Sequence, residues 1–177
     1  MNKKKFKKIK MSNNYVRRKL IKRKNNKKFP LITIITVVYN NASHIQKTLN
    51  SIFSQKYKNY ELIVIDGASN DGTLEIIKKN KSKIDFWISE PDKGIYDAFN
   101  KGMKYATGDY IGFVNSDDIL MPDALKILVK YIFKYPYWSR YQSRSSISYN
   151  FNTPAAVARF FNSNIYKYWL FHHVTNY

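Results

Sequence analysis

The chain has 177 residues and a formal net charge of +19, a length that fits one domain with a hydrophobic core. It contains no cysteine, which excludes a disulfide framework, a cysteine-ligated metal site and a cysteine nucleophile. No run reaches the ~18 apolar residues that a membrane-spanning helix needs, and the lysine-rich N-terminus lacks the apolar stretch of a secretory signal.

The first predicted segment is a basic tail. Residues 1–28 hold 14 Lys or Arg and no acidic residue, whereas residues 29–177 hold 17 basic and 12 acidic residues. This composition predicts a solvated, disordered arm, with attachment to an anionic membrane surface as the functional alternative. We expect a cytoplasmic protein, peripheral at the inner face of a membrane if the tail binds lipid. Nucleic-acid binding ranks well behind, because the charge lies outside the fold.

The first strand and helix follow the tail directly. The continuous, β-branched run at residues 31–38 predicts a strand that is buried on both faces of a sheet. Apolar residues then recur with helical spacing up to Phe53, behind a capping box formed by Ser43 and Gln46.

The alternation of strands and helices continues to about residue 135. Further strands are predicted at residues 61–65, 84–88 and 109–114, and further helices behind the capping residue Asp71, from Ile95 to Met103 and from Pro122 to about Phe133. This order predicts an α/β domain over residues 29–135, with an open, mostly parallel sheet and helices on both faces. Such sheets bind ligands in a crevice at the carboxyl ends of their strands.

Residues 136–177 show no clean periodicity, and we expect a diverged or truncated C-terminal region there. Residues 155–171 suggest a helix followed by a short apolar segment. All 12 acidic residues lie between Glu61 and Asp123, so the C-terminal region supplies no carboxylate. Its two histidines, at positions 172 and 173, can titrate near neutrality but are interpreted as incidental.

Polar residues follow the ends of three predicted strands. Tyr39 and Asn40 follow the first strand, Asp66 follows the second, and residues 115–118 (Asn-Ser-Asp-Asp) follow the fourth. Because the carboxyl ends of parallel strands meet at one edge of the sheet, we expect these side chains to converge on one crevice.

The carboxylates at these strand ends suit a nucleotide ligand. Asp66 could accept hydrogen bonds from the base or ribose, while Asp117 and Asp118 could hold a cation on a diphosphate. Paired carboxylates are hard oxygen ligands that favour Mg²⁺ or Mn²⁺ over zinc. The structural alternative for a lone Asp after a strand is a turn residue or a helix cap, which is our interpretation of Asp71 and remains open for Asp118.

Five segments, taken in order, resemble the family 2 glycosyltransferases, which have the GT-A fold. The similarity runs from Leu31 to about Leu125 and rests on Val37-Val38-Tyr39-Asn40, on Ser51 and Gln55, on residues 66–73 (DGASNDGT), on residues 89–102 (SEPDKGIYDAFNKG) and on Asn115-Ser116-Asp117. Residues 89–102 are similar to the bacterial polysaccharide-biosynthesis branch. Each segment alone is a weak signal, but five in the family's order and spacing are a strong one.

The resemblance implies a donor site for a nucleotide sugar. The implied donor-binding residues are Thr36, Val38 and Tyr39 around the nucleobase, Asp66 hydrogen-bonded to the base, Asp92 to Asn100 along the diphosphate and donor sugar, and Ser116. Asp117, with Asp118 beside it, would coordinate Mn²⁺ or Mg²⁺. We expect a UDP-sugar, with GDP- and dTDP-sugars as alternatives, and a saccharide or lipid-linked acceptor whose hydroxyl attacks with inversion.

Three departures from the family pattern affect this expectation. Gly67 stands where many relatives have a second Asp, and Asn115 replaces the first Asp of the metal motif. No acidic residue follows Asp123, although the family's general base lies downstream of the metal motif, so the catalytic base is unknown. Two functions therefore stay open: a metal-assisted transferase, or a catalytically incomplete remnant that binds the nucleotide sugar without transferring it.

Overall fold

The computed structural model describes residues 15–17, 29–134 and 159–162. Most of the predicted tail and of the predicted C-terminal region, including both of its histidines, therefore lies outside the described residues. The division of the chain into three parts stays a prediction. No helix in the described part of the chain is long and apolar enough to cross a membrane.

The described residues form strands and helices that alternate from β2 to α4. The strands are β1 (Tyr15–Arg17), β2 (Ile32–Val38), β3 (Tyr60–Asp66), β4 (Phe86–Ser89), β5 (Tyr110–Phe113) and β6 (Arg159–Asn162). The helices are α1 (Ala42–Phe53), α2 (Thr73–Lys79), α3 (Ile95–Tyr105) and α4 (Ala124–Lys134).

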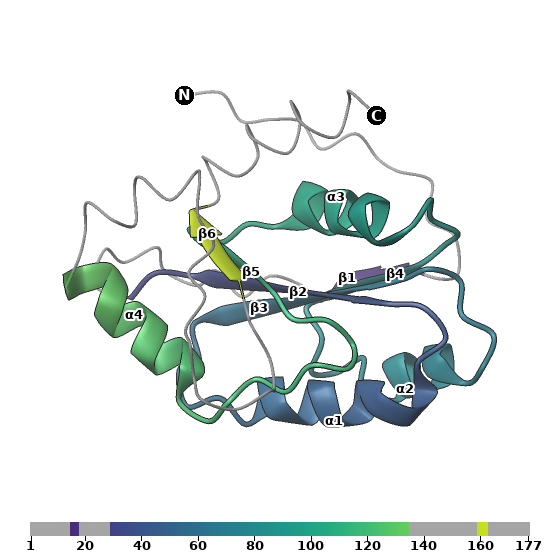
Figure 1. The fold of residues 1–177 in the computed structure, drawn as a ribbon, viewed down its shortest axis with the longest axis horizontal. Helices are drawn as coiled ribbons and strands as arrows, with labels where there is room; N and C mark the ends of the chain where they lie inside the picture. The colour runs from purple at the N-terminus through teal and green to yellow at the C-terminus, as the bar shows by residue number, and fades with distance from the viewer. Residues whose placement is uncertain (1–14, 18–28, 135–158, 163–177) are drawn as a thin grey trace.

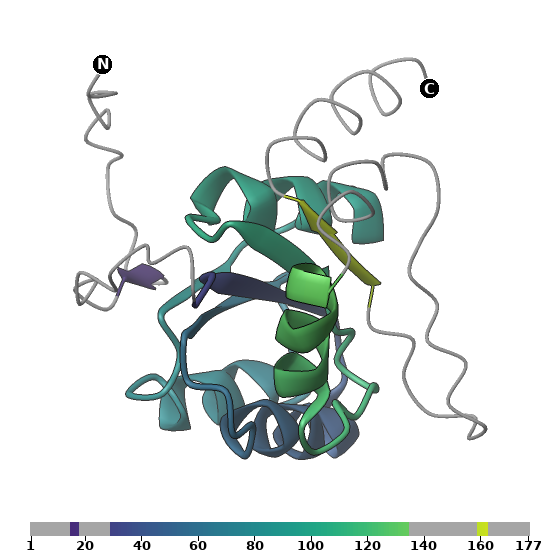
Figure 2. The ribbon, with the colours of Figure 1, turned by 90° about the vertical axis from the view of Figure 1, so that its left-hand side faces the viewer.

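All of these strands belong to one sheet with the order β1-β4-β3-β2-β5-β6. The central strands β4, β3, β2 and β5 are parallel, and β1 and β6 pair with them antiparallel at the two edges. Helices α1 and α2 lie on one face of the sheet and α3 on the other (Figure 1), and the view along the sheet shows the same layers (Figure 2). This architecture confirms the prediction of an open, mostly parallel α/β sheet covered on both faces.

Strand β2 lies at the centre of the hydrophobic core. All seven of its residues are buried, and successive side chains point to opposite faces of the sheet. Ile34 and Val38 pack in the cluster that contains the buried side chains of α1 and α4, whereas Ile35 and Val37 pack in the cluster that contains those of α3. Burial on both faces is what the β-branched run predicts.

Buried Glu61 on β3 supports the turn that leads into β5. Its carboxylate accepts hydrogen bonds from the Thr107 backbone N–H (2.6 Å) and hydroxyl (2.8 Å), and from the Gly108 N–H (3.2 Å). A Cβ at Gly108 would lie 2.7 Å from the Thr33 nitrogen, so only glycine fits there. These contacts give Glu61 a structural role in aligning β5 with β2.

Several local predictions were wrong. The capping box at Ser43 and Gln46 is absent, because α1 begins at Ala42 and Ser43 already lies within the helix. Pro122 precedes α4 by two positions instead of lying in its first turn.

The two edge strands were not predicted from the sequence. The suggested helix near residue 160 is contradicted by β6, and no strand was expected at β1. Both segments pair with an edge of the parallel sheet, where backbone hydrogen bonding to a neighbour outweighs local propensity.

Candidate functional site

The carboxyl ends of β4, β3, β2 and β5 form a row along one edge of the sheet. Val38 pairs with Asp66 across β2 and β3, and Asp66 pairs with Ser89 across β3 and β4. Along the chain, β2 leads to β3 on one side, while β5 lies on its other side. This reversal of direction is the topological switch at which doubly wound sheets bind their ligands.

Hydrogen bonds connect the loop after β2 with the loop after β3. The Asn40 N–H donates to Ser69 Oγ (2.8 Å), and the Asn70 N–H donates to Asn40 Oδ1 (2.9 Å). Asp71 accepts from the N–H of Ala42, the first residue of α1, at 2.9 Å. The two loops therefore form one connected structure at the carboxyl edge of the sheet.

Asp71 was predicted to cap α2, but the N-cap position is Gly72, and Asp71 instead binds the first residue of the helix. One carboxylate oxygen accepts from the Thr73 N–H (3.0 Å) and the Thr73 hydroxyl (2.6 Å). The hydrogen bonds from Thr73 and from the Ala42 N–H lower the pKa of the Asp71 carboxyl. Both carboxylate oxygens of Asp71 are therefore engaged by groups of the protein itself, and we do not assign this residue to ligand binding.

Asp66, predicted to contact a base, is fully buried at the end of β3. Its carboxylate accepts hydrogen bonds from the hydroxyls of Ser69 (2.5 Å) and Ser89 (2.6 Å), and from the Ser69 N–H (3.2 Å). The sequence reasoning missed both serines. Ser89 could have been found, because it ends β4 as Asp66 ends β3.

Tyr39, Gly67 and Asp92 come together from the ends of three neighbouring strands. The Tyr39 side chain is 65% exposed. A Cβ built on Gly67 would lie 2.7 Å from Asp92 Oδ2 and 3.3 Å from Cδ2 of the Tyr39 ring. The other Asp92 oxygen accepts from the Gly94 N–H at 2.9 Å. The missing side chain at Gly67 therefore leaves the space that the Asp92 carboxylate occupies.

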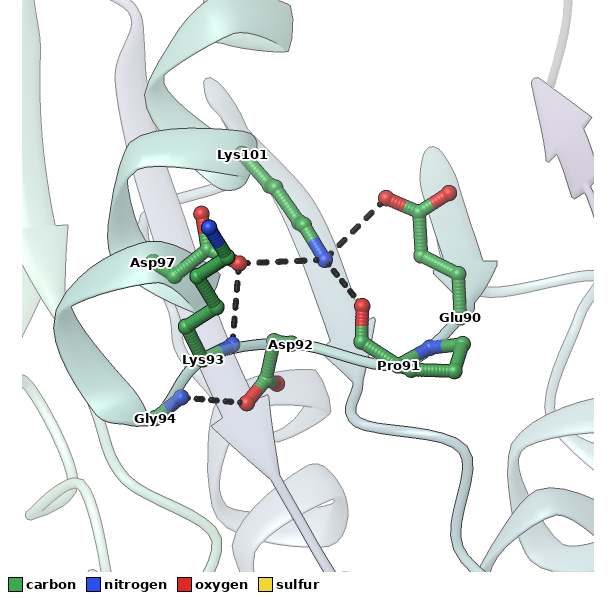
Figure 3. Close-up of polar contacts among 7 residues, drawn as sticks. All are labelled: Glu90, Pro91, Asp92, Lys93, Gly94, Asp97 and Lys101. Carbon is green, nitrogen blue, oxygen red and sulfur yellow. Dashed lines mark hydrogen bonds and ion pairs between the residues drawn. The ribbon is translucent and has the colours of Figure 1, made fainter.

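Lys101 of α3 holds the segment that carries Asp92. Its Nζ donates to the Pro91 carbonyl (2.7 Å) and forms ion pairs with Glu90 (3.2 Å) and Asp97 (3.4 Å), as Figure 3 shows. Asp97 also accepts from the Lys93 N–H at 3.1 Å, and this hydrogen bond, followed by the Lys101 charge, lowers the pKa of Asp97. We call Lys101 together with Glu90, Pro91 and Asp97 the Lys101 clamp. These contacts were not predicted from the sequence.

The loop after β5 is attached to α1. The Thr48 hydroxyl lies 2.8 Å from the carbonyl oxygens of both Ser116 and Asp118, and Asn41 Nδ2 donates to Ser116 Oγ (2.8 Å). Within the loop, the Asn115 N–H donates to Asp118 Oδ2 at 3.1 Å. The predicted donor-binding residue Ser116 is buried, and its hydroxyl is already engaged by Asn41.

Asp117 is the exposed carboxylate of this loop, and its side chain makes no hydrogen bond to the described residues. Asp118 is half-buried; burial raises the pKa of its carboxyl, opposed by the Asn115 hydrogen bond and reinforced by the Asp117 charge. No group of three or more His, Cys, Asp or Glu side chains among the described residues could enclose a metal. One or two carboxylates completed by ligand phosphates is the way proteins hold Mg²⁺, so this loop fits such a cation.

Ser51 and Gln55 at the end of α1 support the segment that follows Asp118. Gln55 is fully buried; its Nε2 donates to the Met121 carbonyl (2.8 Å), and its Oε1 accepts from the Leu125 N–H (3.2 Å). Ser51 Oγ accepts from the Leu120 N–H at 2.9 Å. These contacts link α1 to the loop of Asp117 and to the start of α4.

The remaining predicted site residues are buried or half-buried. Thr36 is fully buried, so contact with a ligand would require its covering side chains to move. Val38 is 5% exposed, and Asn100 is half-buried on α3. A cavity of about 730 Å³ contains none of the predicted site residues, since it lies between α4 and the side chains of Phe29 and Tyr57.

A mostly parallel sheet with a topological switch point at β2 and an exposed aspartate after β5 defines a doubly wound α/β fold, a class that binds ligands at this edge of the sheet. Two solved structures identify it as the GT-A fold of glycosyltransferases. A Pyrobaculum calidifontis mannosyltransferase in complex with GDP-Man and Mn²⁺ matches with a TM-score of 0.55 and 28% identity, over 58% of this chain and 32% of that one. Staphylococcus aureus TarS 1-349 in complex with UDP-GlcNAc matches with the same score and identity, over 59% of this chain and 32% of that one.

The chain belongs to glycosyl transferase family 2, whose sequence profile matches residues 33–175. An uncharacterized glycosyltransferase of Mycobacterium tuberculosis is 38% identical over 90 residues, which are 50% of this chain and 34% of that protein. The matched region thus spans about a third of the relative and of each solved structure.

Proposed function

We propose that this chain binds a nucleoside-diphosphate sugar and provides the donor site of a glycosyltransferase that transfers the sugar to an acceptor hydroxyl. The observation that carries the proposal is the single row of strand ends. Tyr39, Gly67 and Asp92 follow the neighbouring strands β2, β3 and β4, and the exposed Asp117 follows β5 on the other side of β2. The bound GDP-Man and UDP-GlcNAc of the two similar structures support a donor of this class.

Asp117 is the residue that would hold a divalent cation, Mn²⁺ or Mg²⁺, together with the donor's phosphate oxygens. The cation would offset the negative charge that develops on the departing nucleoside diphosphate. Asp118 lies beside it and fixes the loop through the Asn115 N–H. Mn²⁺ in the similar mannosyltransferase complex supports a divalent cation of this kind.

Transfer with inversion needs a base within hydrogen-bond reach of the acceptor hydroxyl. At the carboxyl edge, the carboxylates of Asp66, Asp71 and Asp97 are occupied by hydrogen bonds within the protein. Asp92 Oδ2 and the Asp117 carboxylate accept no hydrogen bond from the described residues, but Asp92 is expected to bind the donor and Asp117 its cation, so neither is assigned as the base. A second candidate function therefore stands beside the first, in which the chain binds the donor and does not itself transfer the sugar.

Thermal unfolding of the whole chain with Mn²⁺ and a panel of UDP-, GDP- and dTDP-sugars tests donor binding. A ligand that binds only the folded state stabilises it by ~2.7 kcal/mol at a hundredfold excess over its dissociation constant. We expect a metal-dependent shift with one nucleotide, and its loss in Asp117→Ala. Glu75→Ala, which removes an exposed acid of α2, is the matched control and should keep the shift.

A cooperative transition that no nucleotide shifts would disprove the donor site. If binding is found, incubation of the labelled donor with saccharide and lipid-linked acceptors distinguishes the two candidate functions. Product that carries the label, with inverted configuration, supports the transferase. Intact donor under saturating conditions supports binding without transfer.

A further inference from the structure

An open hollow of about 730 Å³ lies between α4 and the residues that lead into β2 and β3. Its volume is within the ~300–1,000 Å³ that small-molecule sites occupy. We propose that this hollow binds an anionic phospholipid of a membrane surface, with the acyl part against its aromatic wall and the phosphate on Lys126 and Lys130 of α4. The inference goes beyond the proposed function and does not depend on it.

The wall of the hollow is apolar and aromatic. Phe29 and Phe133 line it and are 50% and 48% exposed, so each leaves about half of a large apolar side chain in contact with water. Tyr57, Ile127 and Val129 line the same hollow. Burial of such surface against hydrocarbon is favourable in proportion to its area. The acyl part of a lipid supplies this hydrocarbon.

The charges of the hollow favour an anion. Lys126 and Lys130 line it, are exposed and make no hydrogen bond or ion pair with the described residues. They lie four positions apart on one face of α4, with roughly 6 Å between their Cβ atoms, so one phosphate can contact both ammonium groups. Asp123 also lines the hollow, but Lys56 offsets its charge in a 3.0 Å ion pair.

The segment that joins the fold at Phe29 carries charge of the same sign. Residues 1–28 contain 14 Lys or Arg and no acidic residue, and α4 contains no acidic residue either. Phe29 is fixed beside the hollow, because its carbonyl accepts from Asn59 Nδ2 at 2.7 Å and the next carbonyl, of Pro30, accepts from the Tyr57 hydroxyl at 2.5 Å. Basic segments near an anionic membrane are attracted to it. The tail and α4 therefore favour the same surface.

The hollow lies at the opposite edge of the sheet from the proposed donor site. Phe29 and Tyr57 come just before the starts of β2 and β3, whereas Asp92 and Asp117 follow the ends of β4 and β5. Figure 1 and Figure 2 both show the start of β2 next to α4. A lipid in the hollow therefore leaves the carboxyl edge of the sheet open to the donor.

Co-sedimentation of the full chain with sucrose-loaded vesicles tests the inference. The partition coefficient is measured on vesicles that contain phosphatidylglycerol and on vesicles of phosphatidylcholine alone. We expect Lys126→Ala/Lys130→Ala to lower the partition coefficient on the anionic vesicles by about tenfold or more. Lys78→Ala/Lys79→Ala removes two exposed lysines of α2 that do not line the hollow. This matched control should lower it by less than about threefold.

Three results of this comparison would overturn the inference. Equal losses in the two double variants would show that net charge alone drives binding, and no loss in either would show that the hollow takes no part. A wild-type chain that binds anionic vesicles no better than neutral ones would exclude an anionic lipid. All four lysines are exposed, so thermal melts should show that both double variants are folded.

The apolar wall is tested at constant charge. Phe133→Ser removes a half-exposed ring from the hollow and should lower the partition coefficient on anionic vesicles by about threefold or more. Ile95→Ser, at a position of α3 that is 49% exposed, is the control and should bind as the wild type does. If Phe133→Ser binds vesicles as tightly as the wild type, no acyl group enters the hollow and the inference is wrong.

Two other occupants of the hollow would give different results in the absence of vesicles. If a second copy of the chain fills it, sedimentation velocity will show a dimer that Phe133→Ser dissociates. If another segment of the same chain fills it, Phe133→Ser will lower the urea midpoint as much as a substitution in the core does. Either result would overturn the lipid assignment. A monomer whose urea midpoint hardly changes in Phe133→Ser supports it.

Discussion

The hydroxyl of Ser89 donates a 2.6 Å hydrogen bond to the buried carboxylate of Asp66, on the neighbouring strand. Both residues end their strands, so the bond ties β3 to β4 at the edge where the ligand is proposed to bind. A buried carboxylate depends on such donors, because it has lost its contact with water.

Replacing Ser89 by Ala should therefore destabilise the fold. The variant leaves the buried Asp66 carboxylate with one donor fewer, and we expect the free energy of unfolding to fall by about 1–3 kcal/mol. Urea denaturation at pH 7 measures the change. Ser82→Ala, at an exposed position between α2 and β4, should change stability by less than about 0.5 kcal/mol. Equal stability of the two variants would show that the Asp66–Ser89 bond contributes nothing.

Ala68 adopts a left-handed backbone conformation, with φ of 65°. This region costs a residue with a Cβ about 1–2 kcal/mol, whereas glycine adopts it freely. Ala68→Gly should raise the free energy of unfolding by about 0.5–1 kcal/mol, after the added entropy of the unfolded chain is deducted. Ala106, with φ of −65°, is the control, since glycine there should lower stability. The same sign of change in both variants would contradict this explanation.

The lowered pKa of the Asp71 carboxyl implies that the stability of the fold depends on pH. Its pKa lies below its ordinary value of 3.8 in the folded protein, so its ionised form stabilises the fold. This contribution is fully present above pH 3.8 and is lost as the pH falls through the lowered value. Asp71→Asn should be less stable than the wild type at pH 7, and the difference should shrink below pH 3.8. Urea unfolding at pH 7 and pH 3 measures it. An equal difference at both values would refute the role of the charge.

Gln55 should be required for the loop that carries Asp117. Gln55→Ala leaves the Leu125 N–H and the Met121 carbonyl without their partner, which should cost about 2–4 kcal/mol of unfolding free energy. Lys56→Ala is the control next to it. Lys56 is 68% exposed and pairs with Asp123 at the surface, so its loss should cost at most about 1 kcal/mol.

The Gln55→Ala and Lys56→Ala variants also test whether α1 supports the proposed cation site. If the loop loses its support, the nucleotide-induced shift in melting temperature should become less dependent on Mn²⁺ in Gln55→Ala and stay unchanged in Lys56→Ala. A metal dependence that survives in Gln55→Ala would show that the contacts of Asn41, Thr48 and Ser51 are enough to hold the loop.

The sequence by itself determined the fold class and the edge of the sheet at which the donor is proposed to bind. A β-branched run such as residues 31–38 can be buried on both faces only in a covered parallel sheet, and polar residues at strand ends meet at one edge whatever the strand order. These are local patterns with a fixed period. They therefore predicted β2 to β5 and the helices between them to within a few residues.

Only the tertiary structure decided which of these residues meet. Ser89 reaches Asp66, and Asp92 fills the space above Gly67, because β4 lies beside β3 and not beside β2. The Lys101 clamp likewise joins α3 to the end of β4, and β1 and β6 are strands because they pair with the sheet edges. Strand order and edge pairing depend on contacts between distant segments of the chain. The periodicity of the sequence does not encode these contacts, so they could not be predicted from it.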